Sequence, residues 1–337
     1  MVHAKPWSAP KPPRKILVMR FQALGDTIIT LPYLQSIRDS YPSVEIHFFT
    51  REEVSMIPKS IHLFHNVITI AGGRNAKIQL ILSLLKLPVL WLHRYDAVID
   101  LQNHKISRLI RKLLGVKAWS EFDKYSPISA GERTQKTIES LWSWKISMRT
   151  KFVLKRDYGC SLLLSENGYK TNNDLVVLNP AGYCSSRNWP LESYVNFAKK
   201  WLTQKPTTQF VLLLLPNQKP KADYLKAKLK DHCIDLTGKA NQIVAFQLIQ
   251  QCRLVLSEDS GLMHMAWTQG IPTIALFSSS RKDWSGPQGS WSMCLDSSDL
   301  ECGPCNLEVC KYGDNRCLTR YEPGLIYSSA CELLSLT

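Results

Sequence analysis

Apolar runs of strand length alternate with amphipathic segments of helix length through most of the chain. In the first half, apolar runs predict buried strands at residues 15–20, 44–50, 67–70 and 97–101. The segments around them predict a helix from Thr27 onward and further helices at residues 75–92, 104–114 and 132–148. This alternation is typical of βαβ units built around a parallel sheet.

The same alternation resumes after a shift in composition at residues 151–173, where Gly and Asn accumulate. We therefore predict an α/β protein of two Rossmann-like domains that face each other across a cleft. The expected segments are a flexible leader at 1–14, a first domain at 15–155, a linker at 156–174, a second domain at 175–323 with a Cys-rich segment at 294–317, and a C-terminal helix at 324–337 that packs back on the first domain.

A polar turn follows the apolar run at 254–256 and precedes a predicted helix that ends near Gly270. Asp259 or Ser260 is suited to cap that helix, and the amides of Ser260, Gly261 and Leu262 would then point outward. Free amides at a helix start after a parallel strand are typical of a phosphate site. An ordinary capped helix explains the same residues without a ligand.

Asp26 ends the Gly-containing turn after the first predicted strand. It is a candidate N-cap of the helix that follows. It also stands beyond the carboxyl end of a parallel strand, where α/β sheets bind and transform ligands.

The chain is strongly basic, with 337 residues, a net charge of +14 and a pI near 9.3. This charge indicates an anionic partner, either phosphates or an acidic membrane surface. No nucleic acid is expected, because zinc-finger spacings and aromatic RNA-binding patterns are missing. The basic segment 104–114 is either a solvated helix face or a platform for anionic lipid or a phosphorylated acceptor.

The sequence contains no apolar export signal, and its longest apolar run, 78–92, is interrupted by Lys86 and Pro88. We therefore expect a cytoplasmic protein that meets the cytoplasmic face of an inner membrane only peripherally. Ten cysteines in a reducing compartment indicate thiols or a metal site. Cys302, Cys305, Cys310 and Cys317 have a spacing suited to a structural zinc or iron site. Four reduced thiols, an iron–sulfur cluster or a redox role are the alternatives.

Three blocks of sequence together resemble glycosyltransferase family 9, the ADP-heptose:lipopolysaccharide heptosyltransferases. They are ILVMRFQALGDTIITLPYLQSIRDSYP, NPAGYCSSRNWPLESY and LSEDSGLMHMAWTQGIPTIALF, in that order. The resemblance implies the GT-B fold, with an acceptor-side first domain and a second domain that binds the nucleotide sugar. It also implies inverting sugar transfer that uses no metal or other cofactor for catalysis.

The resemblance also assigns roles to residues that match the family's motifs. Asp26 corresponds to the proposed general base, with Arg20 and Gly25 beside it on the acceptor side. Arg187 would neutralise the diphosphate leaving group. The residues matched to the donor sugar and its phosphates are Asp259, Ser260, Gly261 and His264.

One loop departs from the family pattern. Residues 216–220 lack the acid expected near the nucleotide ribose, so the turn of Thr237 and Gly238 becomes the candidate nucleoside contact. Our hypothesis is transfer of heptose from ADP-heptose to an anionic lipopolysaccharide-core acceptor. A protein-modifying heptosyltransferase, a transferase with another donor sugar, and a non-catalytic nucleotide-sugar-binding protein are the alternatives.

Overall fold

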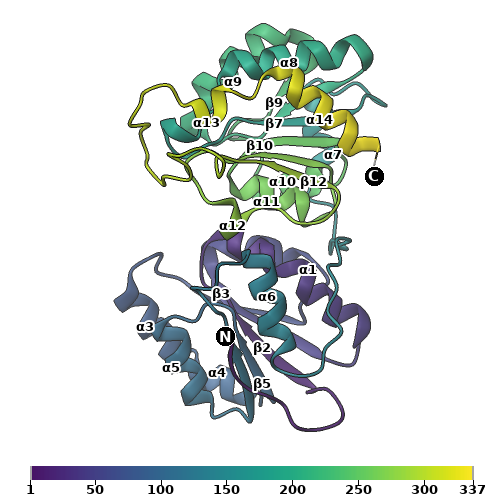
Figure 1. Ribbon diagram of the computed structural model, residues 1–337. Coiled ribbons are helices and arrows are strands. Elements are labelled where there is room, and N and C mark those ends of the chain that lie inside the picture. The colour runs from purple at the N-terminus through teal and green to yellow at the C-terminus, as the bar shows by residue number, and fades with distance from the viewer. Residues whose placement is uncertain (1, 336–337) are drawn as a thin grey trace. The chain divides into compact units, whose positions relative to one another are not determined.

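The computed structural model describes residues 2–335 and divides between Arg156 and Asp157 into two compact units. Each unit is a six-stranded sheet covered by helices (Figure 1). The prediction of two Rossmann-like α/β domains is confirmed. No helix within residues 2–335 combines the length and the apolar character needed to cross a bilayer.

The sheet of the first unit has the strand order β1-β6-β5-β2-β3-β4. Its strands are β1 (His3–Lys5), β2 (Lys15–Met19), β3 (Glu45–Arg51), β4 (Asn66–Ile70), β5 (Ala97–Asp100) and β6 (Ala118–Glu121). Its helices are α1 (Leu24–Ser40), α2 (Met56–Ser60), α3 (Ala76–Leu85), α4 (Leu87–Leu92), α5 (Lys105–Leu114) and α6 (Ala130–Glu139), with a 3₁₀ turn at Glu52–Val54. All neighbouring strands are parallel except β1, which pairs antiparallel with β6.

The sheet of the second unit has the order β12-β11-β10-β7-β8-β9, and all its strands are parallel. Its strands are β7 (Leu175–Asn179), β8 (Gln209–Leu212), β9 (Cys233–Asp235), β10 (Leu254–Glu258), β11 (Thr273–Leu276) and β12 (Ser292–Leu295). Its helices are α7 (Cys160–Glu166), α8 (Leu191–Gln204), α9 (Lys219–Leu229), α10 (Gln242–Ile249), α11 (Gly261–Trp267), α12 (Lys282–Ser285), α13 (Arg316–Thr319) and α14 (Pro323–Ser335), with 3₁₀ turns at Ser185–Arg187, Pro216–Gln218 and Lys230–His232.

Each sheet has one point where the chain reverses the direction in which it adds strands. In the first unit β3 and β4 extend the sheet from one side of β2, whereas β5 and β6 extend it from the other. In the second unit the corresponding central pair is β7 and β10. Ligands of open α/β sheets bind beyond the carboxyl ends of the strands at such a switch point. We therefore expect a ligand-binding site at the loops that follow β2, β5, β7 and β10.

The structure corrects three of the predicted segments. The leader is not simply flexible, because residues 3–5 form β1 and the indole of Trp142 donates a hydrogen bond to the carbonyl of Ala9. The segment expected to be a linker belongs largely to the second unit, where α7 packs against α10. The predicted helix at 132–148 ends at Glu139, because Trp142 and Trp144 instead turn their rings onto Tyr41.

The C-terminal helix was predicted correctly as a helix but assigned to the wrong partner. Helix α14 packs on α8 and on strands β11 and β12 of its own unit. Its buried residues Ile326, Ala330 and Leu333 join the apolar core around Trp189 and Trp201. This stripe is the apolar face of the helix, and the second unit offers the apolar surface that covers it.

Candidate active site

The switch point of the second unit brings two polar strand ends together. Asn179 closes β7, and its side-chain amide donates hydrogen bonds of 2.8 Å to the hydroxyls of Ser257 and Ser260. Ser260 in turn caps α11, because its hydroxyl accepts a hydrogen bond from the backbone N–H of Met263 at 3.2 Å. Of the two predicted caps, Ser260 is therefore the one that caps the helix, and the Asp259 carboxylate instead contacts Arg187.

Arg187 and Asp259 form an ion pair at this switch point. Nη1 of Arg187 lies 3.4 Å from Oδ2 of Asp259, and its Nε donates to the hydroxyl of Ser279 at 3.4 Å. The Arg187 side chain keeps 25% of its surface exposed. Two residues predicted from distant blocks of sequence are thus neighbours, and the guanidinium remains accessible to an anion.

Glu258 is a residue of this site that the sequence analysis missed. Its buried carboxylate accepts hydrogen bonds from the backbone N–H of Gly182 at 2.5 Å and of Trp189 at 2.6 Å. Burial raises the pKa of this carboxyl to about 7, although the two amide hydrogen bonds and the nearby Lys221 act in the opposite direction. An acidic residue ending a buried strand was the signal available in the sequence. Glu258 fixes both ends of the loop that carries Arg187.

The loop between Gly182 and Trp189 is held tightly by further contacts. The Lys221 ammonium donates to the carbonyl of Pro180 at 2.7 Å and to the side chain of Asn188 at 2.5 Å. A Cβ at Gly182 would lie 2.2 Å from the carbonyl oxygen of Arg187, so only glycine fits there. The position of Arg187 is therefore set by backbone contacts on both sides.

His264 and the first turn of α11 were also predicted to bind the nucleotide sugar. Gly261 and Leu262 are partly exposed in the first turn of the helix, next to Ser260. His264 is 5% exposed, and its Nδ1 accepts a hydrogen bond of 3.0 Å from the indole of Trp267. The imidazole is thus packed inside the unit beneath the exposed turn.

Thr237 and Gly238 lie at a different point of the same sheet. They follow β9, and Gly238 has a left-handed backbone with φ of 72° and donates to the carbonyl of Leu214 at 3.0 Å. Pro216 lies against this turn, since a Cβ at Gly238 would be 3.2 Å from it. The turn therefore adjoins the loop 216–220 that lacks the expected acid, and it is separate from the ion pair of Arg187.

In the first unit, Asp26 does not occupy the predicted N-cap position of its helix but takes part in the capping from the third helical position. Helix α1 begins at Leu24, so Gly25 and Asp26 lie in its first turn. The Asp26 carboxylate reaches back, and its Oδ2 accepts a hydrogen bond of 2.8 Å from the N–H of Ala23. The same oxygen lies 2.8 Å from Nη2 of Arg20. The predicted residues Arg20 and Asp26 are thus direct partners at the end of β2.

The loop before Asp26 is anchored by side chains from neighbouring strands. Oε1 of Gln102 accepts hydrogen bonds from the backbone N–H of Phe21 at 2.9 Å and of Gln22 at 3.1 Å. Nε of Arg51 donates to the carbonyl of Phe21 at 2.8 Å. These anchors come from the segment after β5 and from the end of β3, and nothing local in the sequence identifies them.

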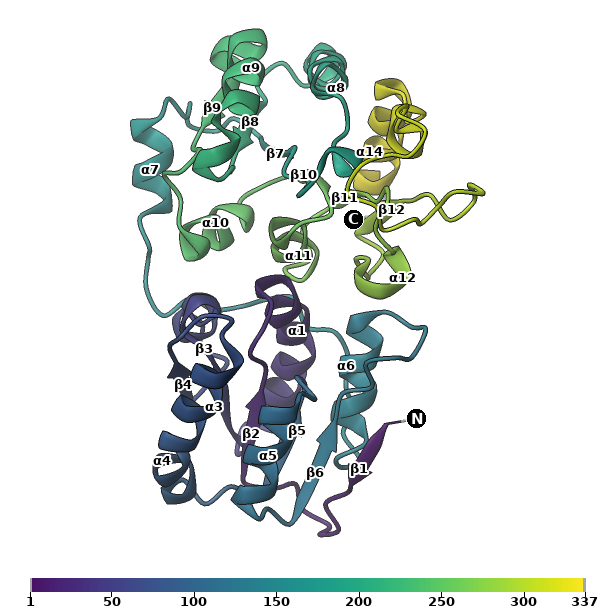
Figure 2. The same ribbon diagram turned by 90° about the vertical axis from the view of Figure 1, so that its left-hand side faces the viewer.

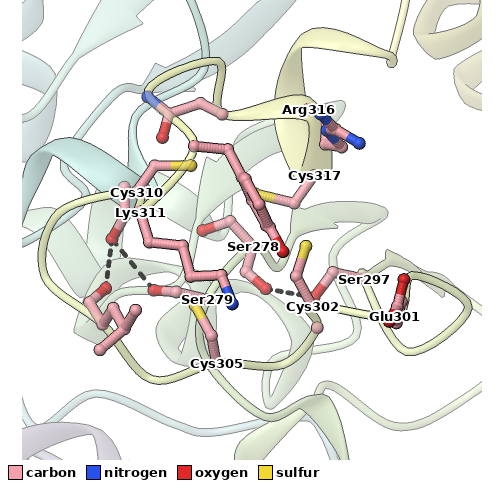
Figure 3. A pocket seen from close by; sticks show the side chains of 15 residues that line it. Ser278, Ser279, Ser297, Glu301, Cys302, Cys305, Cys310, Lys311, Arg316 and Cys317 are labelled. Atoms are coloured by element: carbon pink, nitrogen blue, oxygen red, sulfur yellow. Dashed lines mark hydrogen bonds between the residues drawn. The ribbon is translucent and has the colours of Figure 1, made fainter.

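Four cysteines of the C-terminal segment line one cavity of about 290 Å³ (Figure 3). They are Cys302, Cys305, Cys310 and Cys317. Across residues 2–335, however, no three His, Cys, Asp or Glu side chains are grouped closely enough to hold a metal ion. Thiolates suit zinc or iron chemically, but their arrangement here does not fit the predicted structural metal site.

Comparisons with known proteins agree with this architecture. A model of glycosyltransferase family 9 (heptosyltransferase) matches residues 146–315. Lipooligosaccharide heptosyltransferase 2 of Campylobacter jejuni is 24% identical over 319 residues, which cover 92% of this chain and 95% of that protein.

Two solved structures extend the similarity to the fold. The glycosyl transferase family 9 protein of Veillonella parvula matches with a TM-score of 0.78 at 18% identity, over 96% of this chain and 98% of that one. The E. coli heptosyltransferase WaaC with ADP matches with a TM-score of 0.69 at 18% identity, over 95% and 99% of the two chains. The predicted GT-B fold is confirmed.

Proposed function

Since the chain belongs to glycosyltransferase family 9 and is a glycosyltransferase, we propose that it transfers a heptose from ADP-heptose to the core of a lipopolysaccharide. The names of its relatives support heptose transfer to this kind of acceptor. The observation that carries the proposal is the ion pair of Arg187 and Asp259 beside the exposed first turn of α11. The guanidinium of Arg187 and the amides of that turn suit the diphosphate of the leaving group, and the carboxylate of Asp259 suits a sugar hydroxyl.

On the donor side, Arg187 binds the diphosphate and balances the charge that develops as the nucleoside diphosphate leaves. Its fork of N–H donors suits two phosphate oxygens, and charge placed where it develops lowers the barrier. The amides of Ser260, Gly261 and Leu262 add donors to the same phosphates. When the donor binds, the Asp259 carboxylate leaves Arg187 and accepts hydrogen bonds from the hydroxyls of the donor sugar. The buried imidazole of His264 packs beneath the first turn of α11.

The nucleoside lies near the turn of Thr237 and Gly238 in this proposal. That turn contacts Pro216 and stands at the carboxyl edge of the sheet. The relative WaaC has been solved with ADP, which favours an adenine nucleotide as the donor's leaving group. The missing acid at 216–220 makes the backbone of this turn the contact available to the ribose.

On the acceptor side, Asp26 removes the proton from the attacking hydroxyl. Arg20 and the N–H of Ala23 both hold its Oδ2, which fixes the orientation of the carboxylate. The acceptor oxygen then attacks the anomeric carbon from the face opposite the leaving diphosphate, so that the configuration inverts. No residue in this scheme serves as a metal ligand, and we propose transfer without a metal.

The acceptor is an anionic glycolipid, which the charge of +14 would attract. We place the enzyme at the cytoplasmic face of the inner membrane, where such an acceptor would be presented.

The direct test is a transfer assay with ADP-heptose and a heptose-deficient core acceptor, read by the mass of the product. Addition of one heptose is the expected result. A thermal-shift series with ADP, UDP, GDP and CMP identifies the nucleotide, because a ligand of the folded state raises its melting temperature. A shift with UDP or GDP would replace the donor, heptose on a protein acceptor would replace the acceptor, and binding without any transfer would indicate a non-catalytic protein.

A further inference from the structure

Helix α3 turns much of its apolar surface to solvent. Its fully buried residues are Gln79 and Ser83, and Leu80 and Leu82 pack partly buried against the core, whereas Ile78, Ile81 and Leu85 are exposed. Gln79 uses its buried amide to hold the carbonyl of Gly73 at 2.7 Å. Burial of apolar side chains normally decides which face of a helix turns inward. The exposed apolar side chains of α3 are therefore unfavourable in water, and we expect a partner to cover them.

The exposed apolar side chains continue onto the next two helices. Of the twenty large apolar side chains exposed among residues 2–335, nine lie on α3, α4 and α5. These nine, which we call the apolar face, are Ile78, Ile81, Leu84, Leu85, Val89, Trp91, Leu92, Leu109 and Leu113. Leu92 and Leu85 are 81% and 68% exposed. A contiguous set of this size marks an interaction surface, whereas single exposed apolar residues do not.

The three helices that carry the apolar face contact one another. They lie side by side along the first unit's sheet in both views (Figures 1 and 2). The indole N–H of Trp91 on α4 donates to the carbonyl of Leu113 on α5 at 3.1 Å, while half of the Trp91 surface stays exposed. Beneath them, Leu87, Leu90, Ile106 and Ile110 supply the buried side that holds the helices to the sheet.

Cations accompany this apolar face. Residues 71–118 contain nine Lys and Arg side chains and two Asp side chains. Asp100 is buried, and Asp96 accepts hydrogen bonds from the backbone of Arg14 and Lys15. The exposed cations are Arg74, Lys77, Arg94, Lys105, Arg108, Lys112 and Lys117. Helix α5 alone places Lys105, Arg108 and Lys112 among the exposed Leu109 and Leu113.

We propose that the apolar face is a docking surface for an anionic lipid bilayer. The apolar side chains enter the boundary between headgroups and acyl chains, Trp91 lies at the headgroup level, and the Lys and Arg side chains contact lipid phosphates. The helices are too short to span a membrane, so they lie along its surface. The biological purpose rests on the proposed function, since a bilayer is where a glycolipid acceptor is found.

Charge decides between a bilayer and a second copy of this chain as the occupant. A symmetric dimer through this surface would bring the same patch of each copy together. The Lys and Arg side chains of one copy would then face those of the other, and like charges oppose each other across an interface. An anionic bilayer satisfies the apolar and the cationic groups at once.

The experiment is co-sedimentation of the full chain with vesicles of phosphatidylcholine alone or mixed equally with phosphatidylglycerol. We expect binding to the anionic vesicles that is at least tenfold weaker for Leu85→Ser/Leu92→Ser and for Lys105→Glu/Lys112→Glu. The matched controls Val153→Ser/Leu162→Ser and Lys151→Glu/Lys199→Glu change side chains of the same types of residue, apolar and Lys, that are also exposed but lie elsewhere, and they should bind as the wild type does. Equal binding by all five proteins, or no binding by the wild type, would overturn the proposal.

Two further measurements separate this proposal from its alternatives. Light scattering should find a monomer before and after Leu85→Ser/Leu92→Ser, and a dimer that this variant dissociates would make the apolar face a contact between copies. In the two variants with weakened vesicle binding, sugar transfer to a deacylated, water-soluble acceptor should be unchanged, whereas transfer to an acceptor embedded in vesicles should fall. A wild type that binds vesicles but transfers to neither acceptor would contradict the proposed function and leave the docking surface intact.

Discussion

Glu258 and Trp189 are joined by a hydrogen bond of 2.6 Å from the backbone N–H of Trp189 to the buried carboxylate. The bond ties the end of β10 to the loop that carries Arg187, and a second bond of 2.5 Å from Gly182 ties down the start of that loop. A buried side chain without direct contact to the proposed diphosphate therefore sets the place of the residue that binds it.

Replacement of Glu258 by Gln tests this positioning role. A carboxylate accepts from both amides, whereas the NH₂ group of Gln accepts from neither, so one buried N–H loses its partner at a cost of about 1–3 kcal/mol. We expect kcat/KM for sugar transfer to fall about 10-fold or more. Glu166→Gln, at an exposed position, is the control. Unchanged kinetics in Glu258→Gln would show that the loop keeps its place without this carboxylate.

The same variant should change how stability depends on pH. Burial raises the pKa of the Glu258 carboxyl from 4.5 to about 7. Between these values the folded state holds a proton that the unfolded state has lost, so the free energy of unfolding decreases as pH rises across this window. At one pKa unit per 1.36 kcal/mol, the decrease amounts to about 3 kcal/mol.

Denaturant unfolding of the wild type and Glu258→Gln between about pH 4.5 and pH 8 measures this contribution. The stability of the wild type relative to the variant should decline with rising pH and level off above about pH 7. A difference that stays constant across the window would mean that Glu258 is ionised throughout.

Asp26→Asn should remove most of the transfer activity while leaving the fold unchanged. General-base catalysis contributes about 10²–10⁴-fold, and we expect a loss in kcat within this range with little change in donor KM. Asn keeps an oxygen that can accept from Ala23 and Arg20, so circular dichroism and the melting temperature should match the wild type. Near-full activity in this variant would remove Asp26 from the role of base.

The affinity for ADP should fall even when Arg187 is replaced by Lys. Lys keeps the charge but has a single donor centre in place of the planar fork, so it reaches either Asp259 or a phosphate oxygen less well. We expect Arg187→Lys to weaken ADP binding about 10-fold and Arg187→Ala to weaken it further, because hydrogen bonds to charged groups contribute about 1.5–3 kcal/mol. Calorimetric titration with ADP measures both. Equal ADP affinity in Arg187→Ala and the wild type would place the diphosphate elsewhere.

Helix α14 should stabilise the second unit through its buried stripe. Ile326 is fully buried, so Ile326→Ala should lower the free energy of unfolding by about 2–5 kcal/mol. Leu325 is 49% exposed on the same helix, and Leu325→Ala should cost less than about 1 kcal/mol. Thermal unfolding of the two variants compares them directly. Equal effects at the two positions would contradict the observed packing of α14.

Local features were the ones that the sequence predicted well. The apolar periods located the strands and most helices, because each period is set by the backbone geometry of its own element. The predicted ends of helices were less accurate where a side-chain contact, and not the apolar period, determines where the helix begins or ends. Helix α1 begins at Leu24, before the predicted Thr27, because Asp26 satisfies an N–H at its start.

The sequence by itself determined the alternation of strands and helices, the two Rossmann-like units, and the family blocks that contain Asp26, Arg187 and Asp259. Only the tertiary structure decided which groups meet: Glu258 with Gly182 and Trp189, Gln102 with the loop after β2, α14 with its own unit, and three helices whose apolar side chains face outward. The physical reason is that periodicity reports how one segment divides its own polar and apolar sides. Hydrogen bonds and packing between distant segments depend on the strand order and on which surface remains to be covered.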